Sequence, residues 1–439
     1  MRPRVVFLSR QRLVGRTNGS SAYLLDLAEA VRAAGLEPHL VQPSPVIFGR
    51  MPILRLKPAM KLFASHAVRG ALRLGDTLIV LNPRVYLAAA IGVIAGVARR
   101  AGISADWARD RKLPHAISTP WTEADYAFVR RTVNPDDIVL ADYMFQIEGL
   151  TALPAPPRAS AIVMHDLYHT RTQSAARLGA DDSIGAISVE EEAACFARAD
   201  AVIAIQENEA DFVRRAVPGV AAILAPMSYA THATPQPGED DRILFVGSNT
   251  PPNVIGLQWL FDHVWPLVRT ARPAARLDIA GTVARGIAAP SPQGVQFLGL
   301  VDDLDTLYAG AGVVISPLTY GSGLKVKLIE ALAQGKAIVA TGITLQGVEA
   351  IAGEAVRAAN APEEFAAAIA DLCADPTARA TLAKRALDVA EAHFSPRAAH
   401  AEFINWLTRK AAWRRGVAMG ESLPQTPHRR TTGFAGRDG

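Results

Sequence analysis

The sequence predicts an α/β fold class in which two doubly wound domains stand in tandem and face each other across a cleft. Three observations support this fold. Short apolar runs that are typical of buried parallel strands alternate with helical patterns along most of the chain. A polar stretch rich in proline and glycine interrupts this alternation near the middle of the chain. On both sides of it, a strand is followed by a turn that contains glycine.

The first half, residues 1–228, begins with an apolar strand at 4–9 and a loop that contains Gly15, Asn18 and Gly19. A helical pattern over 20–34 stops at Gly35, and a second strand follows at 38–41. This strand–helix–strand start predicts a Rossmann-like sheet. Further strands of this domain are expected at 77–81, 138–141, 160–164 and 201–205.

A basic insertion at about 47–74 interrupts the first domain. Its apolar residues alternate with positive charges, which predicts an amphipathic helix or a hairpin. The apolar stretch from Tyr86 to Ala98 is shorter than a membrane-spanning helix needs, and we interpret it as a helix buried against a sheet.

The second half follows a linker at 229–241 and forms a domain over 242–395. Strands are expected at 242–246, 275–280, 295–298, 312–315 and 337–341. Helices are expected between them at 254–268 and 303–309, and after them at 365–372 and 378–392. A last helix at 396–416, which could cross back to the first domain, precedes a basic tail at 417–439 that we expect to be disordered.

One unit of the second domain, Ser316 to Thr341, combines a strand, a glycine turn, a helix and a strand. The turn Gly321–Gly323 directs backbone N–H groups and a helix N-terminus to one place, which suits a phosphate. Lys325 and Lys327 place positive charge in the first helical turn, where an anionic ligand would compensate for them. Glu330 lies one turn further on, at a distance suited to sugar hydroxyls.

Composition narrows the class of protein. The chain has 439 residues, half of them hydrophobic, which is enough for two or three domains with cores. Only two cysteines occur, Cys195 and Cys373, so we expect a reducing compartment and neither a disulfide framework nor a zinc site. The N-terminus does not have the pattern of a signal peptide. The sequence therefore predicts a cytoplasmic protein, with peripheral contact at the inner membrane face left open.

The net charge of +4 is concentrated in two regions, the basic insertion and the C-terminal tail. This distribution favours local surface patches over a nucleic-acid partner. For the insertion two interpretations stay open, an anionic membrane surface or a solvated loop. Its basic residues are Arg50, Arg55, Lys57, Lys61, Arg69 and Arg73.

Four segments, in the right order and spacing over residues 242–355, resemble the donor domain of the group-one glycosyltransferases (glycosyltransferase family four). They read V-G-S-N-T-P-P-N, L-D-I-A-G, F-L-G-L-V-D-D-L-D-T-L-Y-A-G-A-G-V-V-I-S-P and G-S-G-L-K-V-K-L-I-E-A-L-A-Q-G-K-A-I-V-A-T. The first half resembles the family by layout and by two local motifs, M-H-D at 164–166 and E-E-E-A-A-C-F-A-R-A-D-A-V-I-A at 190–204. The resemblance implies the GT-B fold and transfer of a sugar from a nucleotide-sugar, usually with retention and without a metal or other cofactor.

The resemblance also implies roles for individual residues. Lys325 and Lys327 would neutralise the donor diphosphate, and Lys325 would thereby assist departure of the leaving group. Glu330 would hold the nucleotide ribose, and Leu298 to Val301 would flank the base. The remaining residues implied at the donor site are Gly247, Ser248, Asn249, Gly281, Gly321, Ser322, Gly323 and Leu324. For the lysines and Glu330 the alternative is a solvated helix face.

Two departures from the family pattern concern the donor sugar. The family often carries a pair of glutamates eight positions apart, and Ser322 stands where the first would be. Many members also carry Arg and Lys after the first strand of this domain, where this chain has Ser248 and Asn249. These changes leave the donor sugar open, and Lys325 and Lys327 could replace the missing cations.

His165 follows a buried strand, at the edge where clefts form in parallel sheets. By resemblance it would face the donor sugar at the reaction centre, with Asp166 positioning it or the acceptor; the alternative is a hydrogen-bonded loop histidine. Gly15, Asn18 and Gly19 would line the acceptor side, or form a plain turn between strand and helix.

Two other motifs are weaker. Asp303 and Asp305 spell the Asp-x-Asp of metal-dependent transferases, but they stand at a helix start, so capping is the better interpretation. No G-x-G-x-x-G with a following acid opens either domain, which argues against a dinucleotide oxidoreductase.

The sequence therefore predicts a hexosyltransferase-type glycosyltransferase that uses a nucleotide-sugar and a glycan or lipid-linked acceptor. Its expected setting is surface polysaccharide or glycolipid synthesis at the cytosolic membrane face. Two alternatives stay open: transfer to a soluble small-molecule acceptor, and a catalytically silent subunit that binds a nucleotide-sugar.

Overall fold

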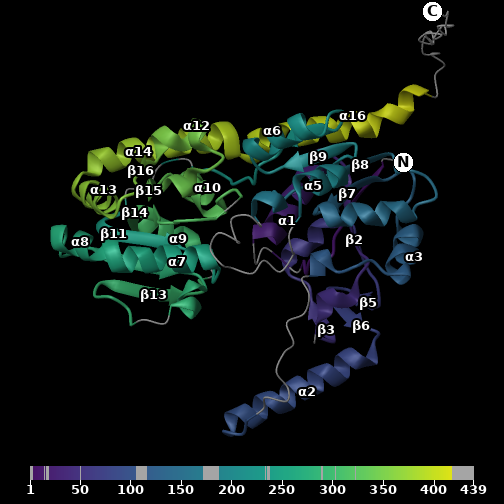
Figure 1. Ribbon diagram of the computed structural model, residues 1–439, viewed down its shortest axis with the longest axis horizontal. Helices are drawn as coiled ribbons and strands as arrows, with labels where there is room; N and C mark the ends of the chain where they lie inside the picture. Colours follow the sequence, from purple (N-terminus) through teal and green to yellow (C-terminus); the bar gives the residue numbers. More distant parts are fainter. Residues whose placement is uncertain are drawn as a thin grey trace, which may run out of the picture.

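The computed structural model describes residues 3–13, 15, 19–49, 51–104, 116–171, 187–232, 234, 238–287, 290–301, 303–321 and 323–417. These residues form two parallel sheets with helices packed around them, one from each half of the chain. Figure 1 shows the two halves side by side, with the N-terminal half in purple to teal and the C-terminal half in green. The predicted α/β fold class with tandem doubly wound sheets is confirmed.

The first sheet has seven parallel strands in the order β10-β9-β8-β7-β1-β2-β4. They are β1 (Arg4–Leu8), β2 (Glu37–Gln42), β4 (Ser65–Val68), β7 (Ile138–Asp142), β8 (Ala159–Val163), β9 (Ala201–Ala204) and β10 (Ala221–Leu224). The chain grows outward from β1 to β4 and then returns to β7 on the other side of β1. This reversal places the topological switch point between β1 and β7, where ligands of such sheets bind.

The second sheet has six parallel strands in the order β13-β12-β11-β14-β15-β16. They are β11 (Glu239–Val246), β12 (Arg276–Ala280), β13 (Val295–Gly299), β14 (Ala311–Ser316), β15 (Ala337–Ala340) and β16 (Arg357–Ala358). Its switch point lies between β11 and β14. Residues 239–241, predicted as linker, belong to β11, because Glu239 pairs with Ala311.

The helices that cover the sheets bury their apolar sides against them. In the first half these are α1 (Gly19–Ala33), α3 (Glu123–Thr132), α5 (Val189–Phe196) and α6 (Glu207–Ala216). In the second half they include α7 (Pro251–Trp259), α8 (Trp265–Ala271), α9 (Leu304–Gly310), α10 (Val326–Ala333), α13 (Pro362–Ala374) and α14 (Pro376–Val389). The single helix predicted at 254–268 is divided by a π-helical turn at Leu260–Val264. Pro266 lacks the N–H that a regular helix would need there.

The last helices cross from the second half to the first. They are α15 (Pro396–Ala399) and α16 (Ala401–Val417). Glu402 accepts a hydrogen bond from the backbone N–H of Leu224 in β10 at 2.9 Å, and Arg158 donates to the carbonyl of Ala411 at 3.0 Å. Figure 1 shows α16 lying along the N-terminal half, so the chain connects the two halves twice. The predicted disordered tail lies outside the described residues after 417.

Two strands of the basic insertion, β3 and β5, form a small antiparallel sheet with the following strand β6 in the order β3-β6-β5, whereas β4 of the same insertion belongs to the main sheet. The strands of the small sheet are β3 (Ile53–Arg55), β5 (Ala71–Leu74) and β6 (Thr77–Val80). β5 and β6 form a hairpin that turns at Gly75, whose φ is +57°, so a hairpin is present but only its first strand lies within the predicted insertion. The strand predicted at 77–81 was wrong as a strand of the main sheet, because β4 pairs with β2 in its place.

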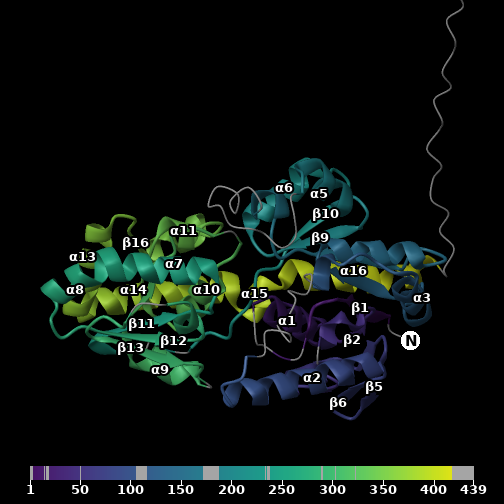
Figure 2. The same ribbon diagram turned by 60° about the horizontal axis from the view of Figure 1, so that its bottom comes forward.

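Helix α2 (Pro83–Arg100) was correctly predicted as a helix, but its predicted burial against a sheet is wrong. Only Ala95 of this helix is fully buried, and most of its large apolar side chains are exposed: Tyr86, Leu87, Val93, Ile94 and Val97. Figures 1 and 2 show α2 standing away from both sheets on one side of the molecule. Among the described residues, no helix combines the length and the apolar character that a membrane crossing requires.

Candidate functional site

A cavity of about 1100 Å³ lies between the two halves of the chain. Its walls come from α1 and the loop after β8 on one side, and from the loops after β11 and β14 together with α10 on the other. The connection between the halves lines its base with Met227, Ser228, Tyr229 and Ala230. Of the predicted site residues, the cavity is lined by Gly19, Asp166, Ser248, Gly321, Leu324, Lys325, Lys327 and Glu330.

The glycine turn before α10 brings the two halves into direct contact. Gly321 and Gly323 have φ values of +134° and +72°, which favour glycine over any residue with a Cβ. A Cβ at position 323 would also lie 2.8 Å from Oδ1 of Asp166, which belongs to the N-terminal half. The turn therefore needs glycine both for its backbone and for this close approach. Ser322 lies outside the described residues.

Lys325 is the residue immediately before α10, and its side chain is largely buried. Its ammonium donates a hydrogen bond to the carbonyl of Gly323 at 2.7 Å. Burial lowers the pKa of Lys325 to about 8, and this effect outweighs the opposing attraction of Asp166, Glu209 and Glu349. Because the ammonium of Lys325 is partly removed from water, it would interact strongly with an anionic ligand in the cavity.

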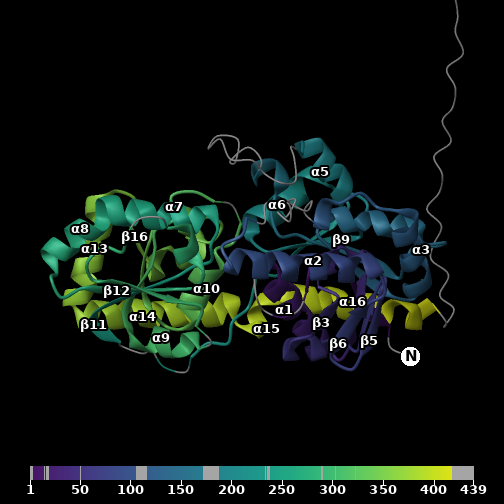
Figure 3. The same ribbon diagram turned by 90° about the horizontal axis from the view of Figure 1, so that it is seen from below.

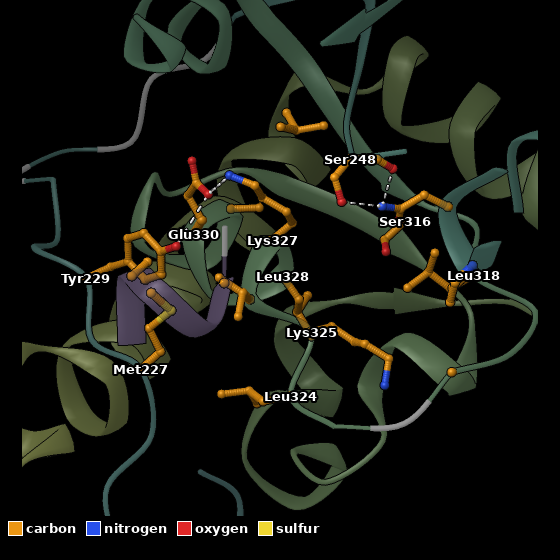
Figure 4. Close-up of a pocket in the computed structure, with 18 of the residues that line it drawn as sticks. Met227, Tyr229, Ser248, Ser316, Leu318, Leu324, Lys325, Lys327, Leu328 and Glu330 are labelled. Atoms are coloured by element: carbon orange, nitrogen blue, oxygen red, sulfur yellow. Dashed lines mark hydrogen bonds and ion pairs between the residues drawn. The ribbon is translucent and has the colours of Figure 1, made fainter. Parts of the chain in front are cut away.

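Lys327 and Glu330 form an ion pair on the first turns of α10. Glu330 is 7% exposed, and its Oε2 also lies 3.5 Å from the hydroxyl of Tyr229, which comes from the connection between the halves. Figure 4 shows the Lys327 side chain directed toward Glu330 and the Lys325 side chain directed elsewhere in the cavity. The two lysines thus line the same cavity but contact different groups: Lys325 contacts the carbonyl of Gly323, and Lys327 contacts Glu330.

The loop after β11 contributes polar atoms beside α10. The amide of Asn253 donates to the carbonyl of Ser248 at 2.9 Å and to Oγ1 of Thr250 at 3.1 Å. These bonds fix the loop at the start of α7, whose first two residues are Pro251 and Pro252. Asn249 does not line the cavity, and its backbone N–H donates to Thr282 at 2.9 Å.

Gly247 and Gly281 pack against each other beneath the cavity. Gly281 has a φ of +102°, and a Cβ there would lie 2.1 Å from the carbonyl oxygen of Gly247. The backbones of β11 and β12 approach this closely only because neither residue has a side chain. The structure therefore gives these glycines a packing role and places neither at the cavity surface.

His165 is held by a carboxylate that sequence reasoning missed. Its Nε2 lies 2.7 Å from Oδ1 of Asp142, the last residue of β7, which has no exposed surface. The other oxygen of Asp142 accepts hydrogen bonds from Ser9 at 2.5 Å and Gln11 at 2.7 Å. A carboxylate with these donors acts as an acceptor, so the proton of His165 resides on Nε2.

Aromatic rings complete the surroundings of His165. The ring of Tyr143 stacks on the imidazole with a centroid separation of 4.0 Å, and the ring of Tyr23 meets it edge-on at 5.5 Å. Tyr143 has a φ of +68°, a conformation that is rare for a tyrosine. His165 is thus fixed at the switch point of the first sheet, although its side chain is not part of the cavity lining.

Asp166, predicted to position either His165 or the acceptor, lies at the contact between the two halves. Its Oδ2 lies 3.6 Å from Nη1 of Arg171, and its Oδ1 faces Gly323. Asp166 therefore lines the contact between the halves, and the positioning of His165 belongs to Asp142.

The remaining predicted residues lie at varying distances from the cavity. Gly19 begins α1 and lines it, whereas Gly15 packs against the stem of Lys57. Asn18 lies outside the described residues. Leu298 in β13 and Val301 after it are partly exposed, and neither lines the cavity.

The capping interpretation of Asp303 is confirmed. Its carboxylate accepts hydrogen bonds from the backbone N–H groups of Asp305 at 2.9 Å and Thr306 at 3.4 Å, at the start of α9. Within the part of the chain that the structure describes, no group of three or more His, Cys, Asp or Glu side chains is arranged to hold a metal ion.

Several cavity residues were not predicted. Tyr229 and Ser228 belong to the connection between the halves, which reads as polar linker, and Asp26 lies on the buried side of α1. The carboxylate of Asp26 accepts from the backbone N–H and the hydroxyl of Ser228, both at 2.7 Å. An acid at a core position of an apolar helix is the signal that would have indicated such a partner.

Comparison with known proteins identifies what the second half resembles. Residues 240–375 match the family model described as glycosyl transferases group 1. A Klebsiella pneumoniae protein named "Uncharacterized 44.6 kDa protein in cps region" is 29% identical over 136 residues. This match covers 28% of the present chain and 35% of that protein.

Solved structures resemble the whole chain in fold. Staphylococcus aureus TarM, in complex with fondaparinux, alpha-GlcNAc-glycerol and UDP, has a TM-score of 0.62 at 12% identity, covering 93% of this chain and 100% of that one. Sucrose-phosphate synthase from Thermosynechococcus elongatus has a TM-score of 0.58 at 16% identity, covering 95% and 100%. These structures confirm the predicted fold, and residues 240–375 are similar to the group 1 glycosyl transferases, whereas membership of the whole chain in that group and in family four stays a prediction.

Proposed function

We propose that the chain is a group 1 glycosyltransferase, and that it moves a sugar from a nucleotide-diphosphate sugar to an acceptor that enters the cavity from the N-terminal half. The observation that carries the proposal is the wall formed by the start of α10. There, Lys325, Lys327 and Glu330 all line a cavity of about 1100 Å³, large enough for a nucleotide-sugar.

In this proposal Lys325 faces the diphosphate and Glu330 receives the ribose hydroxyls. The desolvated ammonium of Lys325 would stabilise negative charge that grows on the diphosphate as the sugar leaves. Lys327 orients the carboxylate of Glu330 through their ion pair. These separate roles, Lys325 at the diphosphate and Lys327 at Glu330, explain why the two side chains point in different directions.

His165 and Asp166 stand on the opposite side in this proposal. Asp142 fixes the tautomer of His165, which we place beside the donor sugar, while Asp166 and Gly19 belong to the acceptor side. Retention of configuration and independence of metals are part of the proposal, because the family resemblance implies both and the two lysines supply positive charge.

The biological setting that we propose is surface polysaccharide or glycolipid synthesis at the cytosolic membrane face. The Klebsiella relative is named for a cps region, and TarM was solved with UDP and glycan ligands. In the basic insertion, Arg55, Lys57 and Lys61 are exposed and suit an anionic surface. Arg69 serves the fold instead, since it donates to the buried Asp125 at 2.8 Å.

Two alternatives lead to different outcomes. An enzyme for a soluble small-molecule acceptor would transfer sugar without any association with anionic vesicles. A silent nucleotide-sugar-binding subunit would bind the donor without turnover on any acceptor, and the position of Ser322 is the reason to keep it.

A thermal-shift screen of nucleotide-sugars, followed by product detection for each binder, tests the proposed function. We expect one class of nucleotide-sugar to raise the melting temperature, because a ligand of the folded state stabilises it by mass action. Hydrolysis or transfer of that donor should be lost in Lys325→Ala and Glu330→Ala. Glu363→Ala is the matched control, because Glu363 is an exposed acid on α13. The absence of a shift with every nucleotide-sugar would overturn the proposal.

A further inference from the structure

Helix α2 exposes a continuous apolar stripe. Its exposed fractions are 64% for Leu87, 67% for Val93, 59% for Ile94 and 61% for Val97, and Tyr86 is 40% exposed. Positions 86, 87, 90, 93, 94 and 97 repeat at helical spacing, so these side chains share one side of the helix. Exposed apolar surface of this extent marks an interaction site on a protein that is otherwise well packed.

The charges around α2 have one sign. Between Thr77 and Ser104 the chain carries no acidic residue. Arg84 lies in the first turn of α2, and Arg99 and Arg100 lie in its last turn, while residues 85–98 carry no charge. Arginine side chains at both ends of an apolar helix can reach the headgroup layer of a bilayer while the middle contacts acyl chains.

The small sheet beside α2 repeats this combination. Ile53 in β3 and Leu72 and Leu74 in β5 are 57%, 51% and 55% exposed. Ile53 and Leu72 both pair with Ile79 of β6, so the three strands direct these side chains to the same face. Arg55 is exposed on β3, and β6 leads into α2 through Leu81, which is itself 66% exposed.

We propose that α2 and the outer face of the β3-β6-β5 sheet dock onto the surface of an anionic lipid bilayer, with α2 lying in the interface. The length of the uncharged part of α2 indicates that the helix lies on the bilayer surface and does not cross it. The uncharged stretch 85–98 is about 21 Å long at 1.5 Å per residue, well short of a hydrocarbon core of about 30 Å. A helix of this kind gains affinity from its buried apolar area and from attraction between its cations and anionic headgroups.

The charges make a second copy of the chain a poor occupant of this surface. If two α2 helices packed against each other, arginines would face arginines, since residues 77–104 provide no acid to pair with them. An anionic bilayer supplies the opposite charge along the whole helix. Charge complementarity therefore favours lipid.

Docking at α2 also deepens the proposed function, on which this consequence rests. Figures 2 and 3 show α2 extending from the small sheet in the direction of the C-terminal half, and Figure 1 shows its far end standing clear of both halves. A bilayer at α2 would bring an acceptor on a lipid carrier to the same side of the molecule as the enzyme's own anchor. Docking itself requires no donor and no turnover.

Sedimentation of the full chain with vesicles tests the proposal. We expect the wild-type chain to bind vesicles of phosphatidylcholine with phosphatidylglycerol, and more weakly those of phosphatidylcholine alone. Leu87→Glu with Ile94→Glu should lower the partition coefficient at least about tenfold, because two charges would enter the apolar layer. The matched control is Ile255→Glu with Leu267→Glu, since these residues are 45% and 40% exposed on α7 and α8. The control should bind like the wild type.

Three results would overturn docking: no vesicle binding by the wild type, equal binding by the α2 variant, or a dimer that the α2 variant dissociates in the absence of lipid. A melting temperature like that of the wild type shows that the α2 variant folds. The nucleotide-sugar thermal shift separates the two proposals. A retained shift with lost vesicle binding concerns α2 alone, whereas vesicle binding without any shift counts against the proposed function only.

Discussion

The imidazole Nε2 of His165 lies 2.7 Å from Oδ1 of Asp142, and 23 residues of chain separate the two. Adjacent parallel strands create the contact. Asp142 ends β7, Val163 ends β8, and these two residues are register partners. The histidine thus receives its orientation from the neighbouring strand, and its sequence neighbour Asp166 is left to contact the glycine turn of the other half.

Replacement of Asp142 tests this relationship. We expect Asp142→Asn to lower sugar transfer at least about tenfold, because the amide no longer selects the proton position on His165. Stability should fall by about 1–3 kcal/mol, since Ser9 and Gln11 lose a charged acceptor. Steady-state kinetics and NMR of the histidine tautomer provide the readouts. His263→Ala, an exposed histidine, is the control; an unchanged tautomer in Asp142→Asn would contradict the assignment.

Glu330→Gln should weaken binding of the nucleotide-sugar at least about tenfold, because a neutral amide accepts hydroxyl hydrogen bonds less strongly than a carboxylate. Calorimetric titration measures this affinity. The loss of the ion pair with Lys327 should change the free energy of unfolding by only about 0.5 kcal/mol, since Lys327 is 45% exposed. Glu363→Gln should bind donor normally, and equal affinity in both variants would exclude Glu330 from the ribose site.

Donor affinity should fall as the pH rises through the pKa of Lys325. This pKa is lowered to about 8 by burial, so the ammonium loses its proton within reach of ordinary assays. Between pH 7 and pH 9 the dissociation constant should rise about tenfold if binding requires the charged form. Lys325→Arg should flatten this dependence, because a guanidinium stays charged. A steep profile that persists in the arginine variant would assign the titration to another group.

The lowered pKa of Lys325 also makes the free energy of unfolding depend on pH. Because the folded pKa lies below the ordinary value of 10.5, the unfolded chain binds more protons between pH 8 and 10.5. The burial of Lys325 therefore opposes folding fully below pH 8, and its cost disappears as the pH rises toward 10.5.

Gly281→Ala should destabilise the second half by about 3 kcal/mol, which combines a left-handed backbone with overlap against the Gly247 carbonyl. Urea denaturation measures this change. Gly353→Ala is the control, since a Cβ there meets nothing within 4 Å and its φ of −57° suits alanine. The control should be neutral or slightly stabilising, and a similar loss in both variants would contradict the packing role.

Chelation should leave transfer unchanged. We expect EDTA to have no effect on the rate, and Asp303→Ala to cost about 1 kcal/mol of stability through the lost cap without affecting activity. Activity assays with and without EDTA, together with thermal melts, check both parts. Inactivation by EDTA that manganese reverses would refute metal independence.

Buried strands were predictable because each is a continuous apolar run between turn residues. The runs at 138–141, 160–164 and 337–341 became β7, β8 and β15 with shifts of one residue at their ends. The short strands β4 and β10 escaped prediction. Ser65–Val68 contains two polar residues, and Ala221–Leu224 continues directly from the turn after α6.

The candidate site was predicted best where one local segment builds it. The glycine turn and the start of α10 contribute Lys325, Lys327 and Glu330 from six consecutive positions, so their proximity follows from helix geometry. The partners of these residues could not be predicted in this way. Asp142 and Tyr229 reach the site through strand order and through the path of the connection, which sequence periodicity does not encode.

Helix α2 illustrates a different limit. Its apolar residues predicted a helix correctly, but an apolar side of a helix is compatible with a protein core or with any other apolar phase. The apolar residues can be read from the sequence, but only the arrangement of the elements shows that, within the described part of the chain, none of the other helices or strands covers them.

The double connection between the halves has a mechanical consequence. The chain passes from the first half to the second after β10 and returns through α15, so two covalent links join the two bodies side by side. Two covalent links restrict the relative motion of the halves more than one link would, and they restrict rotation about the line through them least. Such a rotation would separate Gly323 from Asp166, so we expect the length of these links to matter for the geometry of the cavity.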